Sequence, residues 1–261
     1  CAILDPKLKT IAPAREWEFG SREAEIEYAR QKKIPIDVTK KSPYSIDKNL
    51  WGISIECGVL EDPWIEPPED AYQMTRDKLK KPKKPVYIEI GFDTGAPVQL
   101  NGARMNPVEL ITALNHAGSE FGIGRSDMVE NRLVGIKSRE VYEAPAAAIL
   151  VAAHKDLEAL TLDRETAHFK DTVSLKYAEL IYYGLWYTPL KNALDKFIDQ
   201  TQKTVTGLIR MKLEPGRCAA VGRKSKFSLY KESLATYTDK DKFDQKLAKG
   251  FIEIWAMPYK K

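Results

Sequence analysis

Residues 144–201 form the longest block of helical patterning in the sequence, and segments with strand patterning lie on both sides of it. We expect three helices in this block, with breaks near residues 163–171 and 184–189. Helices gathered between groups of strands favour an α+β fold, because a sheet built from repeating β-α-β units would alternate the two. The predicted fold class is therefore α+β.

Before this block, the sequence predicts two strands and a capped helix. Residues 86–90 alternate apolar and polar side chains, and residues 97–100 form a second strand that ends in an Asn-Gly turn. Asn106 and Glu109 have the spacing of a capping box, so a helix is expected to begin at Pro107. Its buried face is expected to carry Leu110, Leu114 and Ala117.

After the helical block, strand patterning returns. Residues 205–213 and 218–221 flank a Pro-Gly turn, and residues 250–255 are expected to form a final strand. Together with the earlier strands, these segments predict mixed antiparallel sheets.

The first 38 residues have a different pattern. Residues 7–12 resemble a short strand, Ser21 can cap a helix over residues 22–32, and residues 33–38 resemble another strand. Strand, helix and strand in this order are typical of an α/β layer, and here the unit is short enough to be the tail of such a domain. Two more segments are expected to contain no strand: residues 43–68 as irregular chain, and residues 70–84 as a polar helix with a linker.

Composition limits the classes of protein. The chain has 261 residues, 43% of them hydrophobic and 30% charged, which is enough to bury a core. The longest apolar stretch, residues 144–153, has half of the roughly 20 residues that a membrane helix needs. The basic run at residues 78–84 lacks the interleaved aromatic residues of a nucleic-acid platform. Cys1, Cys57 and Cys218 form no C-x-x-C pair. We expect a soluble, cytoplasmic protein with no nucleic-acid or membrane partner and no metal site.

Common catalytic motifs are absent from the sequence. It contains no Gly-x-x-x-x-Gly-Lys-Ser/Thr phosphate loop, no dinucleotide-binding glycine motif and no Gly-x-Ser-x-Gly elbow. His116, His154 and His168 have no metal-ligand spacing, and we expect surface or interface roles for them.

Two stretches mix polar and apolar residues without a clear period. Residues 43–62 fit a loop that folds over a polar ligand, or a loop whose Ser45 and Asn49 satisfy turn backbone. Residues 122–143 interleave charges with β-branched residues. This pattern fits a structural ion network, or a site for a zwitterionic ligand whose ammonium and carboxylate groups meet charges of opposite sign.

Both stretches resemble the argininosuccinate synthase family. Residues 43–50 read Pro-Tyr-Ser-Ile-Asp-Lys-Asn-Leu, residues 54–61 read Ser-Ile-Glu-Cys-Gly-Val-Leu-Glu, and residues 124–139 follow the family's Gly-Arg-x-Asp-x-Val-Glu-Asn-Arg-x-x-Gly-x-Lys-Ser-Arg. The likeness runs nearly end to end. The departures are Ala14 where the family commonly has Trp, Ser126 where it has Ile or Val, and Cys57 where it has a small residue.

The resemblance implies an ATP-dependent carbon–nitrogen ligase. In the family, the ureido oxygen of citrulline attacks the α-phosphorus of ATP, and the amine of aspartate then displaces AMP from citrullyl-adenylate to give argininosuccinate. It also implies ATP with Mg²⁺ as co-substrate, and a homotetramer as the assembly of the whole enzyme. The citrulline contacts implied for this chain are Ser45, Ser54, Glu130 and Tyr142. No catalytic, cofactor-binding or metal-binding residue is implied here.

The resemblance also implies two parts. Residues 1–38 correspond to the end of an ATP-binding α/β domain, and residues 39–261 to the synthetase domain that binds citrulline and forms oligomers. The family's Ser-Gly-Gly-x-Asp-Thr-Ser pyrophosphate loop does not occur in this sequence, which begins with Cys1. We expect a fragment that is inactive alone. The alternative is a binding or scaffold protein that uses the synthetase domain without ATP.

Overall fold

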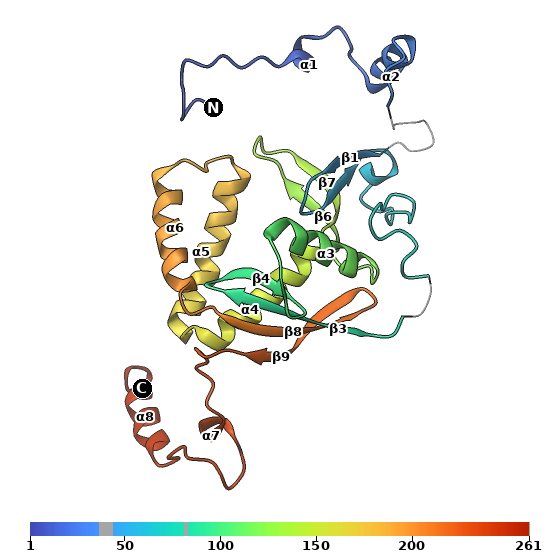
Figure 1. The fold of residues 1–261 in the computed structure, drawn as a ribbon. Coiled ribbons are helices and arrows are strands. Elements are labelled where there is room, and N and C mark those ends of the chain that lie inside the picture. The colour runs from blue at the N-terminus through green and yellow to red at the C-terminus, as the bar shows by residue number, and fades with distance from the viewer. Residues whose placement is uncertain (37–43, 81–82, 261) are drawn as a thin grey trace.

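A computed structural model describes residues 1–36, 44–80 and 83–260 (Figure 1). Its β-strands form two antiparallel sheets, one of four strands and one of five. The helices are α1 (Pro13–Glu16), α2 (Arg22–Gln31), α3 (Pro107–Ser119), α4 (Pro145–Thr161), α5 (Arg164–Tyr182), α6 (Pro189–Gln202), α7 (Glu232–Ala235) and α8 (Leu247–Ala256), with short 3₁₀ turns η1 (Gly58–Glu61) and η2 (Met257–Tyr259). The strands are β1 (Ser45–Lys48), β2 (Ile53–Glu56), β3 (Val86–Asp93), β4 (Ala96–Leu100), β5 (Ala103–Arg104), β6 (Arg125–Asn131), β7 (Lys137–Glu143), β8 (Gly207–Glu214) and β9 (Arg217–Lys224).

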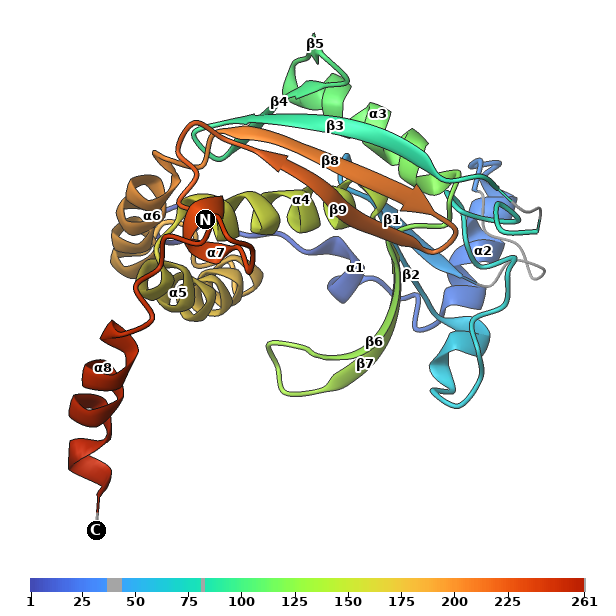
Figure 2. The ribbon, with the colours of Figure 1, turned by 90° about the horizontal axis from the view of Figure 1, so that it is seen from below.

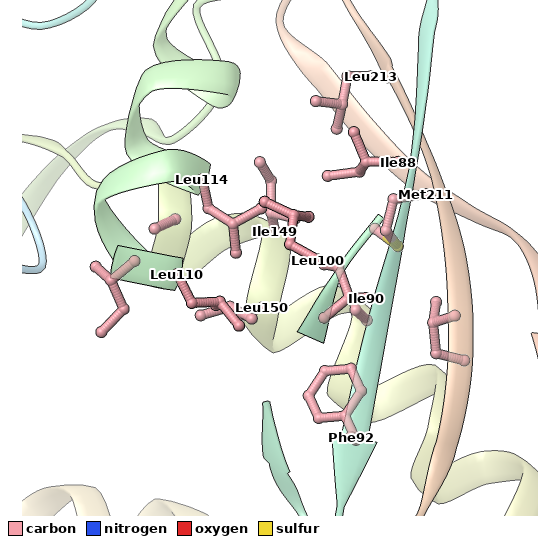
Figure 3. Packing of buried hydrophobic residues seen from close by; sticks show 14 of the residues in the cluster. Ile88, Ile90, Phe92, Leu100, Leu110, Leu114, Ile149, Leu150, Met211 and Leu213 are labelled. Atoms are coloured by element: carbon pink, nitrogen blue, oxygen red, sulfur yellow. The ribbon is translucent and has the colours of Figure 1, made fainter. Parts of the chain in front are cut away.

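The larger sheet has five strands in the order β5-β4-β3-β8-β9. Ile88 on β3 is opposite Met211 on β8, and Ile90 is opposite Ile209, so these side chains point to the same face. Helices α3 and α4 pack on that face. Figure 3 shows their leucine and isoleucine side chains pointing toward the sheet. This is the main hydrophobic core, and it includes Ile88, Ile90, Phe92, Leu100, Leu110, Leu114, Ile149, Leu150, Met211 and Leu213.

Local signals predicted the elements around this core correctly. The Asn106 side chain accepts the Glu109 backbone N–H, and the Glu109 carboxylate accepts the Asn106 N–H, so the capping box at α3 is confirmed. The Asn101-Gly102 turn joins β4 to β5, with both residues at positive φ as a two-residue hairpin requires. The β8–β9 hairpin forms around Pro215-Gly216 as expected.

The smaller sheet has four strands in the order β1-β2-β7-β6. Its central pairing joins β2 to β7, which are far apart in the sequence: Ile53 is opposite Glu143, Ser54 opposite Tyr142, and Ile55 opposite Val141. One face of this sheet lies on a second, smaller core. That core contains Tyr44, Ile53, Ile55, Leu60, Ala71, Tyr72 and Val141.

Several predictions for the first 80 residues are wrong. Residues 7–12 form no strand, nor do residues 33–36; residues 37 and 38 lie outside the described part. Residues 44–68, expected to be irregular, contain the β1–β2 hairpin. The helix expected within residues 70–84 does not form at residues 70–80, 83 or 84; residues 43, 81 and 82 lie outside the described part. The helix capped by Ser21 is confirmed as α2, since the Ser21 hydroxyl accepts the Ala24 backbone N–H.

The helical block is confirmed as α4, α5 and α6, but its first break covers only Leu162 and Asp163, because Asp163 caps α5. The strand predicted at residues 250–255 is wrong: this segment belongs to helix α8, which lies apart from both sheets (Figures 1 and 2). Leu247, Phe251, Ile254 and Trp255 follow helical spacing, and the six-residue window was too short to show that period. Within the described residues, no helix has both the length and the apolar character needed to cross a bilayer.

Candidate functional site

Strand register places the predicted site residues on one face of the four-stranded sheet. Ser54 on β2 is directly opposite Tyr142 on β7, so both side chains point the same way. On the other side of Ser54 lies Asp47 of β1, and Ser45 is two residues before it on the same face. We call this face the site face.

Glu130 also belongs to the site face. Tyr142 is opposite Ser126 on β6, and Glu130 follows Ser126 by four residues, an even number that preserves the direction of the side chain. The Tyr142 hydroxyl donates a hydrogen bond of 2.7 Å to Glu130 Oε2. The register thus places Ser45, Ser54, Glu130 and Tyr142 on one face of the sheet, although they come from four strands. Burial, followed by the bond to Glu130 and its charge, raises the pKa of Tyr142.

Two more carboxylates lie on the site face near Glu130. The Arg132 guanidinium donates to Glu56 at 3.2 Å, to Glu140 at 3.3 Å and to the Ser138 hydroxyl at 2.9 Å. Burial, then the hydrogen bond to Glu56 and its negative charge, raises the pKa of Glu140. Two of the three glutamates on this face therefore share one guanidinium, and Glu130 accepts its hydrogen bonds from tyrosines. This excess of negative charge favours a ligand that brings an ammonium group.

The opposite face of the same hairpin contains a structural ion network. Arg125 donates to both carboxylate oxygens of Glu69, at 2.8 and 2.9 Å, and to the Thr75 hydroxyl at 2.6 Å. Its guanidinium also lies 3.7 Å from the centre of the Tyr72 ring. The fully buried Glu143 carboxylate accepts the Thr75 hydroxyl and three consecutive backbone N–H groups, which hold residues 73–75 against the sheet.

Arg139 completes this network. It binds both oxygens of Asp127, at 2.9 and 2.7 Å, and donates to the carbonyl oxygens of Leu60, Asp62 and Ile65. The Arg139 guanidinium holds the pKa of Asp127 below its usual value. The structural ion network, one of the two interpretations of residues 122–143, is therefore present on this face of the hairpin.

A hollow of about 230 Å³ opens beside Ser54 and Tyr142, against the turn that joins β1 to β2. The Asn49 carboxamide oxygen accepts the N–H groups of Trp51 and Gly52, so Asn49 stabilises the turn. A Cβ atom added to Gly52 would lie 2.2 Å from the Glu143 carbonyl oxygen. Glycine is therefore required where this turn meets the end of β7.

The histidines do not contribute to this hollow. His116 and His168 are exposed. His154 lines a second hollow of about 500 Å³, where its Nε2 is 2.8 Å from the Gln202 side-chain oxygen. Gln202 in turn donates to Glu158, which pairs with Lys170. Within the described residues, no group of three or more His, Cys, Asp and Glu side chains is placed to hold a metal ion.

Sequence reasoning missed Glu56 and Glu140 on the site face, and Tyr182, which contacts it. Glu140 is an even number of residues from Tyr142, so strand alternation would have placed it beside the four predicted residues. Tyr182, at the end of α5, donates a hydrogen bond of 3.3 Å to Glu130 Oε1. No local pattern indicates this contact, because it depends on how a helix packs near a distant hairpin.

Comparisons with known proteins show the family of the chain. Residues 44–261 match the family model described as "Arginosuccinate synthase C-terminal domain". The chain is similar to the argininosuccinate synthases of Chlorobium phaeobacteroides strain BS1 (56% identity over 259 residues, 99% of this chain and 64% of that protein) and Chlorobium luteolum (54% over 259 residues, 99% and 65%). Its identity to the argininosuccinate synthase of Gloeobacter violaceus is 57% over 255 residues, 98% of this chain and 64% of that protein. The chain thus spans 64% to 65% of the length of these curated relatives. It belongs to the argininosuccinate synthase family.

Proposed function

We propose that this chain provides the citrulline-binding part of an argininosuccinate synthase. The whole enzyme would be an ATP-dependent carbon–nitrogen ligase that joins citrulline and aspartate through citrullyl-adenylate, releasing pyrophosphate and AMP. The observation that carries the proposal is the site face, where Ser45, Ser54, Glu130 and Tyr142 come together from four strands.

The chemistry of these side chains fits citrulline. Its α-ammonium group would meet Glu130, in a region where Glu56 and Glu140 share the Arg132 guanidinium. The hydroxyls of Ser45, Ser54 and Tyr142 would bind its carboxylate or ureido group, since a hydroxyl both donates and accepts hydrogen bonds. The hollow beside Ser54 and Tyr142 offers room for part of such a ligand.

ATP, Mg²⁺ and aspartate would be bound mainly by residues other than those of the site face. The sequence contains no phosphate-binding loop, and the described acidic side chains fit no metal site. We assign no step to a metal held by this chain. In this proposal residues 1–38 are the end of an ATP-binding domain and residues 39–261 the synthetase domain. The cytoplasm is the proposed location, which the free thiols of Cys1 and Cys218 suit.

We also propose that the chain forms homo-oligomers, a tetramer in the whole enzyme, through residues 144–201. Leu175 on α5 is 76% exposed, and Trp186 and Tyr187 after it are about half exposed. Large apolar side chains that are exposed on one protein surface are typical of an interface with another protein. Light scattering on the purified chain is expected to give a mass above that of a monomer, and a strict monomer at high concentration would contradict the proposal.

The test of the citrulline site is Glu130→Gln, measured by isothermal titration calorimetry. The change keeps the volume and removes the charge, so citrulline affinity is expected to fall about 10-fold to 150-fold, the value of one charge-assisted hydrogen bond. The melting temperature is expected to change little, because Arg125 and Arg139 pair with other carboxylates.

The control is Glu66→Gln, which removes an exposed carboxylate elsewhere and is expected to bind citrulline as the wild type does. Unchanged affinity in Glu130→Gln, together with a lower melting temperature, would assign Glu130 a structural role and contradict the proposal.

A further inference from the structure

Glu130 is contacted by a tyrosine from each of two separate elements. Tyr142, on the neighbouring strand, donates to Oε2 at 2.7 Å, and Tyr182, from the last turn of α5, donates to Oε1 at 3.3 Å. Each carboxylate oxygen therefore has its own hydroxyl donor. The second contact joins α5 to the four-stranded sheet.

Two donors on two oxygens restrict how the carboxylate turns. The last torsion of a glutamate side chain is broad, so a single hydrogen bond leaves the plane of the carboxylate poorly fixed. With Tyr142 on one oxygen and Tyr182 on the other, that plane is defined. An ionised carboxylate has about four acceptor positions, so positions remain on both oxygens of Glu130 for a ligand.

The Tyr182 hydroxyl is carried by a well-supported helix. Lys170 of α5 pairs with Glu158 of α4 at 2.9 Å, and the Tyr177 hydroxyl donates to Asp195 of α6 at 2.8 Å. The helix ends at Tyr182, and Gly184, at φ +70°, then donates its N–H to the Ile181 carbonyl oxygen. A donor on such an element is placed more accurately than a donor on a loop.

We propose that Tyr182 is a positioning residue for Glu130, and that it orients this carboxylate toward the α-ammonium group of the amino acid bound on the site face. The inference rests on the proposed function. It assigns Tyr182 no direct contact with the ligand. Burial, and then the charge of Glu130, raises the pKa of Tyr182, so its hydroxyl remains protonated and able to donate near neutral pH.

The test compares Tyr182→Phe with Tyr183→Phe. The centres of the two rings are 5.9 Å apart, and both rings are partly exposed. Of these two tyrosines, Tyr182 is the one that donates a hydrogen bond to Glu130 in the described part of the chain. Calorimetric titration with citrulline is expected to show about 3-fold to 10-fold weaker binding by Tyr182→Phe, as for the loss of one moderate hydrogen bond. Tyr183→Phe is expected to bind as the wild type does, and both variants are expected to melt near the wild-type temperature.

A second ligand separates positioning from general damage to the site. 5-Ureidopentanoic acid is citrulline without its α-amino group, so it cannot use the orientation of Glu130. Its affinity, measured by NMR titration, is expected to be the same for the wild type and Tyr182→Phe. Equal losses for both ligands would overturn the inference, as would unchanged citrulline binding by Tyr182→Phe. A wild-type chain that binds no citrulline would overturn the proposed function together with this inference.

Discussion

Replacing Glu143 with glutamine tests whether the buried carboxylate holds residues 73–75 against the sheet. Its Oε1 atom accepts the Thr75 backbone N–H at 2.7 Å and the Thr75 hydroxyl at 2.6 Å, and its Oε2 atom accepts the Gln73 N–H at 2.6 Å. The Met74 N–H is 3.1 Å from both oxygens. Glu143 is fully buried, so water cannot replace a lost partner.

The size of the effect follows from these contacts. Glutamine has one acceptor oxygen, and its NH₂ group would face at least the Gln73 N–H. Both of these groups are donors, so neither could accept a hydrogen bond from the other. Losing hydrogen bonds to a charged acceptor costs about 1.5–3 kcal/mol each, and a buried donor left without a partner costs about 1–3 kcal/mol. We therefore expect Glu143→Gln to lower the free energy of unfolding by about 3–5 kcal/mol, as when a buried charged group loses its partner.

Urea unfolding followed by circular dichroism measures this loss. Glu61→Gln, at an exposed glutamate of η1, is the control and is expected to stay within about 0.5 kcal/mol of the wild type. A Glu143→Gln variant within about 1 kcal/mol of the wild type would refute the reasoning, because the buried acceptor would then contribute no more than a surface residue.

Three further outcomes are expected. Cys57 has φ 74° and ψ 175°, a backbone conformation that costs a residue other than glycine about 1–3 kcal/mol. Cys57→Gly is therefore expected to raise the free energy of unfolding, measured in urea, by about 1 kcal/mol, and no gain would contradict this. The pKa of Glu140 is raised in the folded chain, so its stabilising contribution is present below the unfolded pKa and lost as pH rises through the folded pKa. The unfolding free energy of the wild type relative to Glu140→Gln is therefore expected to fall over that window, and a constant difference would contradict the shift. Finally, the chain is expected to release no pyrophosphate from ATP and citrulline in a coupled assay, because it contains no phosphate-binding loop; turnover above the no-enzyme control would contradict this.

The elements predicted correctly depend on contacts between residues close in sequence. The capping box of Asn106 and Glu109 spans three residues, and the turn at Pro215-Gly216 sets the β8–β9 hairpin. Alternation along β3 matches a strand with one face on the core. Such signals are complete within one segment, and the structure forms each of them where expected.

The incorrect predictions concern segments whose structure depends on distant partners. Residues 7–12 have the composition of a strand, but a strand needs a neighbour to satisfy its backbone, and residues 7–11 are exposed. The β1–β2 hairpin was missed because its place in a sheet depends on a strand far away in the sequence. Its short strands become part of a sheet only through the pairing of β2 with β7, residues 53–55 with residues 141–143. Helix α8 was missed because only six of its residues were judged.

The two faces of the β6–β7 hairpin differ in how their charged side chains are paired. On the buried side, Arg125 and Arg139 face carboxylates that pair with them directly, so this network is complete without a ligand. On the site face, Arg132 binds Glu56 and Glu140, whereas the two oxygens of Glu130 accept hydrogen bonds from neutral tyrosine hydroxyls. A partly buried carboxylate whose hydrogen-bond donors are neutral gains most from a ligand that brings a positive charge. The sequence left both interpretations of residues 122–143 open because strand register, which assigns each charge to a face, depends on the partners of β7.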